Sequence, residues 1–240
     1  MRARNKAYSF LVFIVFTGYV LATTVNIETD DADGYLYDKD ATYLTAQQKT
    51  TADVNDGGGE HFVVGQQIDE SNDFYVYRAG LFFDTNSIPD DQVIQSAYIT
   101  LHFENQPTLS LPFYIIIQSG MPNHPNMPTM VVADYNQGLY GGNGGQLSSE
   151  DVVQGQYNNI ILNATGKEWI NRSGYTRFML RSSRDINQQI PQSEEPESWQ
   201  IRSAEHTSNT PPKLVVTYSE GSFRQLVNGT LANDKSQMCK

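Results

Sequence analysis

Two acidic loops near the start of the chain carry the residue types that bind hard cations. The first holds the candidate ligands Asp30, Asp31, Asp33 and Asp38, and the second, from Asp53 to Glu60, is hinged by three consecutive glycines. Ca²⁺ takes six to eight oxygen ligands, and carboxylates on a hinged loop suit it. Neither loop has the spacing of an EF-hand, so solvated turn residues are the alternative. The one cofactor that we expect is a structural Ca²⁺.

A second group with chemical potential is the tyrosines, of which the chain has 14. Tyr135 and Tyr140 lie in a long segment, residues 120–145, that is rich in Pro and Gly, and Tyr35 and Tyr37 accompany the first acidic loop. A loop of this length inside a compact domain is usually functional or mobile. We expect these four rings to be exposed and to stack on a ligand, and ordinary loop packing is the alternative.

The sequence does not predict a reaction centre. It contains no nucleophile elbow, P-loop, dinucleotide-binding glycine pattern or HExxH motif. The four histidines have no metal-ligand spacing: His61, His102, His124 and His206. Two carboxylates suffice for a glycosidase. The candidates in this loose sense are Glu194, Glu195, Glu197 and Glu205. We expect no enzyme, and a polysaccharide hydrolase or lyase is the alternative.

The stretch from Phe74 to Phe103 organises the elements that must position these groups. Two apolar runs with a period of two flank a Pro-Asp-Asp break, which predicts two paired strands with one face buried. Arg78 and Asp84 share one face of the first strand, six residues apart. We expect them to form an internal Arg–carboxylate pair that fixes the strand register, with ligand contact as the alternative role.

Similar short alternating runs continue to the last predicted strand, residues 213–218. A short helix is expected over residues 165–170, capped by Thr165 and followed by Gly174. Eight or nine short strands, long loops and one short accessory helix predict an all-β protein with a jelly-roll-like β-sandwich.

Residues 1–22 have the pattern of a secretory signal peptide, with three basic residues, an apolar stretch and a small-residue exit at Ala22. The apolar stretch is shorter than the roughly 20 residues that span a bilayer, so we expect cleavage rather than a retained anchor. Cleavage would change the formal charge from −11 to −14, which excludes a basic nucleic-acid-binding surface. The expected organisation is a signal peptide (1–22), a sandwich domain (23–219) and a flexible tail (220–240) that contains the single cysteine, Cys239.

A set of short pieces spans roughly residues 31–218: residues 33–35, 64–65, 77–85, 87–89, 94–101, 174, 180–182, 185–186 and 212–218. In these pieces the sequence resembles the DNRLRE-type domains, extracellular jelly-roll modules that include carbohydrate-binding modules. Such modules usually occur fused to enzymes or surface anchors, whereas this chain carries one domain. The resemblance implies glycan binding.

These observations lead to two hypotheses for a secreted or cell-surface protein. The first is a non-enzymatic module that binds an extracellular polysaccharide or other glycan, stabilised by Ca²⁺. The second is a structural subunit of a filament, matrix or surface layer that self-associates by donating a strand or pairing sheet edges. We expect no nucleic-acid partner and no membrane span after cleavage. Three sequons, at Asn163, Asn171 and Asn228, predict a glycoprotein.

Overall fold

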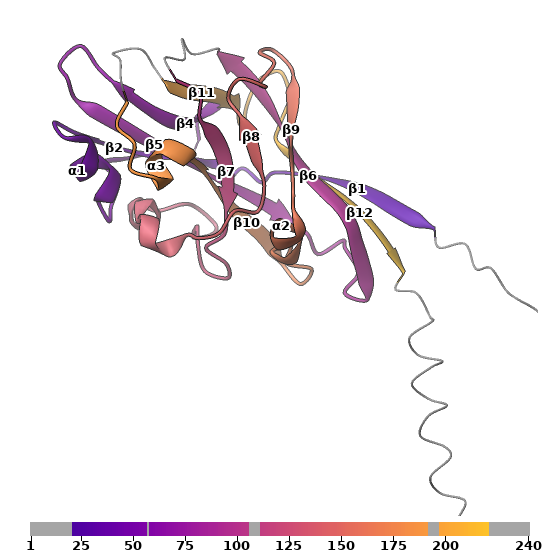
Figure 1. Cartoon of the computed structure of the whole chain (residues 1–240). Helices are drawn as coiled ribbons and strands as arrows, with labels where there is room; N and C mark the ends of the chain where they lie inside the picture. The colour runs from indigo at the N-terminus through magenta and orange to yellow at the C-terminus, as the bar shows by residue number, and fades with distance from the viewer. Residues whose placement is uncertain (1–20, 57, 106–110, 192–196, 221–240) are drawn as a thin grey trace, which may run out of the picture. The chain divides into compact units, whose positions relative to one another are not determined.

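The computed structural model describes residues 21–56, 58–105, 111–191 and 197–220, and those from Ala22 onward form one compact body (Figure 1). The predicted signal peptide lies almost entirely outside the described residues, as do Cys239, Asn228 and nearly all of the predicted tail. None of the described helices is long and apolar enough to cross a membrane.

The body is built from strands in one large, curled antiparallel sheet, which confirms the all-β, sandwich-like prediction. The strands of the described residues are β1 (Ala22–Glu28), β2 (Gly34–Asp40), β3 (Val54–Asp56), β4 (His61–Ile68), β5 (Phe74–Asp84), β6 (Gln92–Asn105), β7 (Tyr114–Gln118), β8 (Gln146–Ser148), β9 (Tyr157–Ile161), β10 (Tyr175–Ser182), β11 (Glu197–Arg202) and β12 (Lys213–Glu220). Their main order in the sheet is β1-β12-β6-β11-β4-β5-β10-β7-β8. Strands β2 and β3 extend the sheet beside β5, and β9 lies beside β6.

The two organising strands, β5 and β6, are not hydrogen-bonded neighbours, so their predicted pairing is wrong. Strand β5 pairs with β2, β4 and β10, whereas β6 pairs with β9, β11 and β12. Because the sheet folds back on itself, these strands instead contribute to one core from opposite sides. Leu81 and Phe83 of β5 and Leu101 and Phe103 of β6 are all fully buried in that core. Burial of each such side chain contributes about 1.5–3 kcal/mol.

A second, smaller core covers the other face of β5. Val76 and Phe82 point into it, alternating with the residues of the main core. It is closed by α1 (Tyr43–Gln48) and by a long loop that contains the 3₁₀ helices η1 (Val132–Tyr135) and η2 (Gln137–Leu139). The predicted long loop therefore forms a packed outer layer on the sheet.

Three short α-helices occur in the described residues, rather than the one that was predicted. They are α1, α2 (Ala164–Glu168) and α3 (Ser183–Ile186). The helix near Thr165 is present, but its cap is Asn163, whose side chain accepts a hydrogen bond from the Gly166 N–H at 3.0 Å. The sequence placed the cap two residues too late because Asn and Thr are both good caps.

The outer layer is fastened to the sheet by a buried ionic network. Arg78 donates two hydrogen bonds of 2.8 Å to Asp185, and Arg181 adds one of 2.7 Å. Burial alone would raise the pKa of Asp185, but the two guanidinium groups outweigh it and hold that pKa below the usual range. Arg78 also lies over the ring of Tyr135, 4.0 Å from its centroid.

The predicted partner of Arg78 is therefore wrong. Asp84 is exposed and accepts hydrogen bonds from Asn86 instead. Residues six apart on a strand lie about 20 Å apart along it, since the rise is about 3.3 Å per residue. Two residues at this spacing can therefore share a face of a strand without touching. The carboxylate that pairs with Arg78 is that of Asp185, from another part of the chain.

Candidate functional site

Four tyrosines on β2 and β5 form a continuous aromatic surface, which we call the tyrosine platform: Tyr35, Tyr37, Tyr75 and Tyr77. Tyr37 lies opposite Tyr77 in the ladder, with ring centroids 5.5 Å apart. Tyr35 and Tyr75 flank this pair diagonally. Tyr35 lies 6.2 Å from Tyr37 and from Tyr77, and Tyr75 lies 5.9 Å from Tyr37 and 6.0 Å from Tyr77. Alternation of side chains along antiparallel strands places all four rings on one face.

This face of β5 continues into the main core, yet most of the platform does not belong to that core. Tyr35 packs against it, whereas Tyr37, Tyr75 and Tyr77 are members of neither hydrophobic cluster. All four rings are half-buried. In Figure 1, β2 and the start of β5 lie at the opposite end of the body from the free ends of β1 and β12.

Polar groups surround the platform. Lys39 extends over the Tyr75 ring, 5.1 Å from its centroid, and forms ion pairs with Asp69 at 3.2 Å and Asp73 at 2.9 Å. The Tyr75 hydroxyl donates to Asp69 at 3.2 Å. One lysine thus faces two aspartates, so this rim carries more negative than positive charge.

Two tyrosine hydroxyls of the platform, those of Tyr35 and Tyr77, keep their protons at neutral pH. Burial, together with the nearby Asp56 carboxylate, raises the pKa of Tyr35 to about 12. Burial likewise raises the pKa of Tyr77, with the neighbouring tyrosines adding to the effect. A protonated phenol both donates and accepts hydrogen bonds, so the platform offers ring faces with hydroxyl groups at their edges.

The prediction that Tyr135 and Tyr140 are exposed stacking residues is wrong. Tyr135 is fully buried and Tyr140 is 8% exposed. The Tyr135 hydroxyl donates to the Ala46 carbonyl at 2.9 Å, inside the second core. These rings hold the outer layer on the sheet and present no face to a ligand. Tyr75 and Tyr77, by contrast, were assigned to the organising strand and not recognised as surface residues.

The four candidate calcium ligands do not converge. Asp38 is buried and pairs with Lys49 at 2.6 Å, and Asp30 accepts hydrogen bonds from the Ala32 N–H and the Tyr175 hydroxyl. Asp31 is exposed. Because these carboxylates have separate partners, the predicted grouping of ligands is wrong.

Asp33, the fourth of these aspartates, has an unusual environment. It is 1% exposed, and its Oδ2 accepts the Ala204 N–H at 3.1 Å, while its Oδ1 has no hydrogen-bond partner. Burial raises the pKa of Asp33 to about 8, and the adjacent carboxylate of Glu205 adds to the rise. A proton on Asp33 allows a hydrogen bond to Glu205 that two carboxylates cannot form.

Two of the loosely proposed catalytic glutamates, Glu197 and Glu205, lie within the described residues. The carboxylate of Glu205 lies near that of Asp33 and contributes to the rise of its pKa. Glu197 is buried against Arg184 and accepts a 3.0 Å hydrogen bond from Gln66. Glu194 and Glu195 lie outside the described residues.

Two of the three predicted glycosylation sites lie within the described residues, and both amides make hydrogen bonds. Asn163 Nδ2 donates to the Asn143 carbonyl at 2.7 Å, and Asn171 Nδ2 donates to the Tyr175 carbonyl at 3.4 Å. An N-linked glycan replaces one of the two hydrogens on Nδ2, so each amide would keep one N–H to donate. Glycosylation of these residues remains a prediction.

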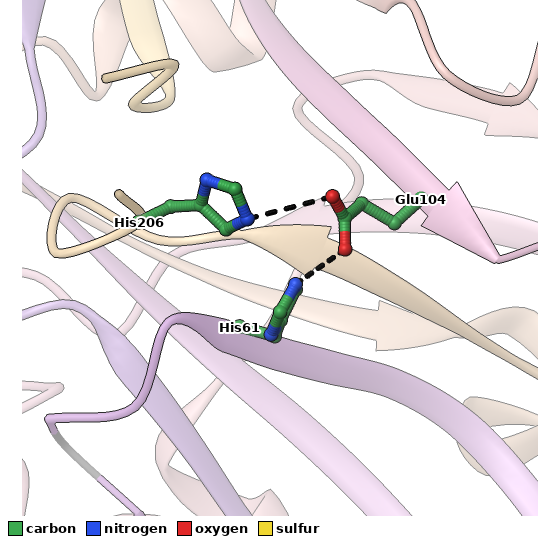
Figure 2. A group of neighbouring side chains, drawn as sticks. All are labelled: His61, Glu104 and His206. Atoms are coloured by element: carbon green, nitrogen blue, oxygen red, sulfur yellow. Dashed lines mark hydrogen bonds and ion pairs between the residues drawn. The ribbon is translucent and has the colours of Figure 1, made fainter. Parts of the chain in front are cut away.

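Two of the histidines do come together, which the linear spacing concealed. His61 and His206 both contact the carboxylate of Glu104 (Figure 2). The three residues come from three different parts of the chain. His102 packs against Tyr157, and His124 bonds to Asp134 at 2.9 Å elsewhere in the body. No signal in the sequence pairs residues that are 43, 102 and 145 positions apart.

The chain matches no protein-family model and no curated protein.

Proposed function

We propose that this protein is a non-enzymatic module that binds an extracellular glycan, with the tyrosine platform as the contact surface. The observation that carries the proposal is that Tyr37, Tyr75 and Tyr77 form a ring surface outside both cores. The faces of aromatic rings carry partial negative charge, and they attract the C–H groups on the flat faces of sugar rings. Binding sites of this kind combine apolar faces with a few fixed polar groups.

The rim charges favour a neutral glycan over an acidic one. Lys39 is already paired with Asp69 and Asp73, and Asp56 lies next to Tyr35. The formal charge of the whole chain is −11. An anionic polysaccharide would therefore meet net repulsion, most strongly at low salt.

The test is a binding measurement on immobilised polysaccharides, both neutral and acidic. We expect retention on at least one neutral polysaccharide, and loss of at least about tenfold in affinity for Tyr37→Ala or Tyr75→Ala, since each removes one stacking ring. Tyr114→Ala is the matched control, because Tyr114 is 46% exposed and lies on β7, away from the platform. Failure of the protein to bind any glycan, or equal losses in all three variants, would refute the proposal.

The second candidate is the structural subunit, and one observation favours it. Among the described residues, β1 pairs only with β12, so its outer edge carries open backbone groups, and its side chains are largely exposed. Such an edge can accept a strand from another copy. Light scattering and electron microscopy of the purified chain distinguish the candidates: filaments or concentration-dependent oligomers support this one, and a strict monomer at high concentration excludes it.

A further inference from the structure

Three side chains that are distant in the sequence converge on one point (Figure 2). His61 begins β4, Glu104 lies near the end of β6, and His206 lies in the loop after β11. One ligand atom from each residue lies within 4.8 Å of the other two. We propose that His61, Glu104 and His206 form a binding site for a divalent transition-metal cation, of which Zn²⁺ is the best fit.

The donor atoms determine the class of metal. Two imidazole nitrogens and one carboxylate oxygen suit Zn²⁺, and also Co²⁺, Ni²⁺ and Cu²⁺, whereas Ca²⁺ and Mg²⁺ prefer oxygen donors alone. Both imidazoles direct Nε2 at the carboxylate: His61 contacts Oε2, and His206 lies 3.4 Å from Oε1. Three protein ligands leave a fourth position of a tetrahedral ion for water or for an outside ligand.

The fold holds two of these ligands on hydrogen-bonded strands and brings the third on a tethered loop. His61 is paired with Arg202 in the β4–β11 ladder, and β11 pairs with β6 next to Glu104. The loop that carries His206 is fixed at its start, since Ser203 bonds through its backbone to Glu60 and through its hydroxyl to Gly59. A cation can reach the group from solvent, because the side chains of His61 and Glu104 are 31% and 23% exposed.

Arg202 orients the carboxylate that the metal would use. It donates to Glu104 Oε1 through Nε at 2.6 Å, and its Nη2 lies at the same distance from this oxygen. Glu104 Oε2 is the oxygen that faces His61. Hydrogen bonds of this kind to a ligand position it, although the positive charge of Arg202 also weakens the attraction of the cation.

One hydrogen bond must be exchanged for metal binding. His206 Nδ1 accepts the Ser208 N–H at 3.1 Å, so the neutral ring carries its proton on Nε2. A metal on Nε2 requires the proton to move to Nδ1, and the bond to Ser208 is then lost. One net hydrogen bond is equivalent to about tenfold in affinity. The binding free energy of zinc sites is many times that of one hydrogen bond. Loss of the bond to Ser208 therefore lowers the affinity for Zn²⁺ without preventing binding.

The experiment is calorimetric titration of the full chain with ZnCl₂ after treatment with a chelator. All proteins carry Cys239→Ser, so that the thiol cannot contribute a zinc ligand. We expect one Zn²⁺ per chain with micromolar or tighter affinity, no heat from CaCl₂ at this site, and a Co²⁺ form with the intense visible absorption of a tetrahedral ion. His61→Ala and His206→Ala should each weaken Zn²⁺ binding at least about a hundredfold, because each removes one of three ligands. His124→Gln is the matched control and should bind like the parent protein.

Glu104→Gln keeps the size of the side chain and tests the carboxylate if an alanine variant fails to fold, with circular dichroism reporting the fold. It should lose Zn²⁺ binding while remaining folded. The proposal is overturned if the parent protein shows no saturable 1:1 binding of Zn²⁺. It is equally overturned if the folded variants at positions 61, 104 and 206 bind as tightly as the control. Neither result depends on whether a glycan binds the tyrosine platform.

Discussion

Replacing the buried Asp33 by asparagine should remove a pH dependence of stability that this single carboxyl group imposes. In the folded protein the pKa of Asp33 is raised from 3.8 to about 8, mainly by burial and further by Glu205. Between these two values the folded state holds a proton that the unfolded chain has released. By linkage, the free energy of unfolding therefore falls as the pH rises across this interval.

The magnitude follows from one proton per chain. Each pH unit inside the interval changes the free energy of unfolding by about 1.4 kcal/mol, so the change from pH 5 to pH 7 is about 3 kcal/mol. That is a large fraction of the 5–15 kcal/mol that stabilises a typical domain. Asparagine has the same size, still accepts the Ala204 N–H, and has no charge to bury, so its contribution stays constant.

The assay is urea unfolding of the wild type and Asp33→Asn at pH 5, 6, 7 and 8, followed by circular dichroism. The difference in unfolding free energy between the two proteins should move in favour of the variant by about 1.4 kcal/mol per pH unit up to pH 7. Titrating groups that lie away from Asp33 are present in both proteins and cancel in the difference. Among them is His102, whose pKa burial lowers and whose contribution has the opposite sign.

Asp31→Asn is the control, since Asp31 lies in the same loop but is exposed. Its stability should differ from that of the wild type by no more than about 0.5 kcal/mol, as expected for a surface substitution. Parallel stability curves for the wild type and Asp33→Asn would refute the reasoning. They would mean that Asp33 is ionised in the folded protein, and that its neighbourhood supplies a positive charge or a solvent path.

Two further predictions concern residues that the sequence assigned to the wrong partner. Arg78→Met should destabilise the protein by about 3–5 kcal/mol in urea unfolding, because it removes one of the two cations that compensate the buried Asp185. Asp84→Asn should change the stability by less than about 0.5 kcal/mol. A comparable loss of stability in both variants would instead support the predicted pair of Arg78 with Asp84. Asn163→Ala should cost about 1 kcal/mol as the loss of a helix cap. Thr165→Ala should cost less, and thermal unfolding that ranks the two in the reverse order would contradict the observed cap.

The sequence was sufficient to predict the class of fold but not the pairing of its strands. Period-two alternation identifies which residues of β5 and β6 face a core, since it depends only on local geometry. It contains no information on which strand lies beside which. Their pairing depends on closure of the whole curled sheet, so two strands that are consecutive in sequence entered opposite sides of the core.

The candidate sites were predictable to a similar extent. Tyr35 and Tyr37 were selected by residue type, and the structure adds Tyr75 and Tyr77 because β2 and β5 are neighbours. Tyr135 was misjudged because a loop rich in Pro and Gly normally lies on the surface, whereas this loop covers a second core. The contacts of Asp33 with Glu205 likewise join distant segments, and no local pattern encodes them.

The pairing of Ala22 with Ser219 brings the entry and the exit of the folded body together at one pole. The tyrosine platform lies at the other pole (Figure 1). If the body is tethered through the start of β1 or the end of β12, to a surface or to another protein, β2 and the start of β5 lie at the end of the body away from the tether. A ligand in the medium could then be captured without steric hindrance from whatever holds the module in place.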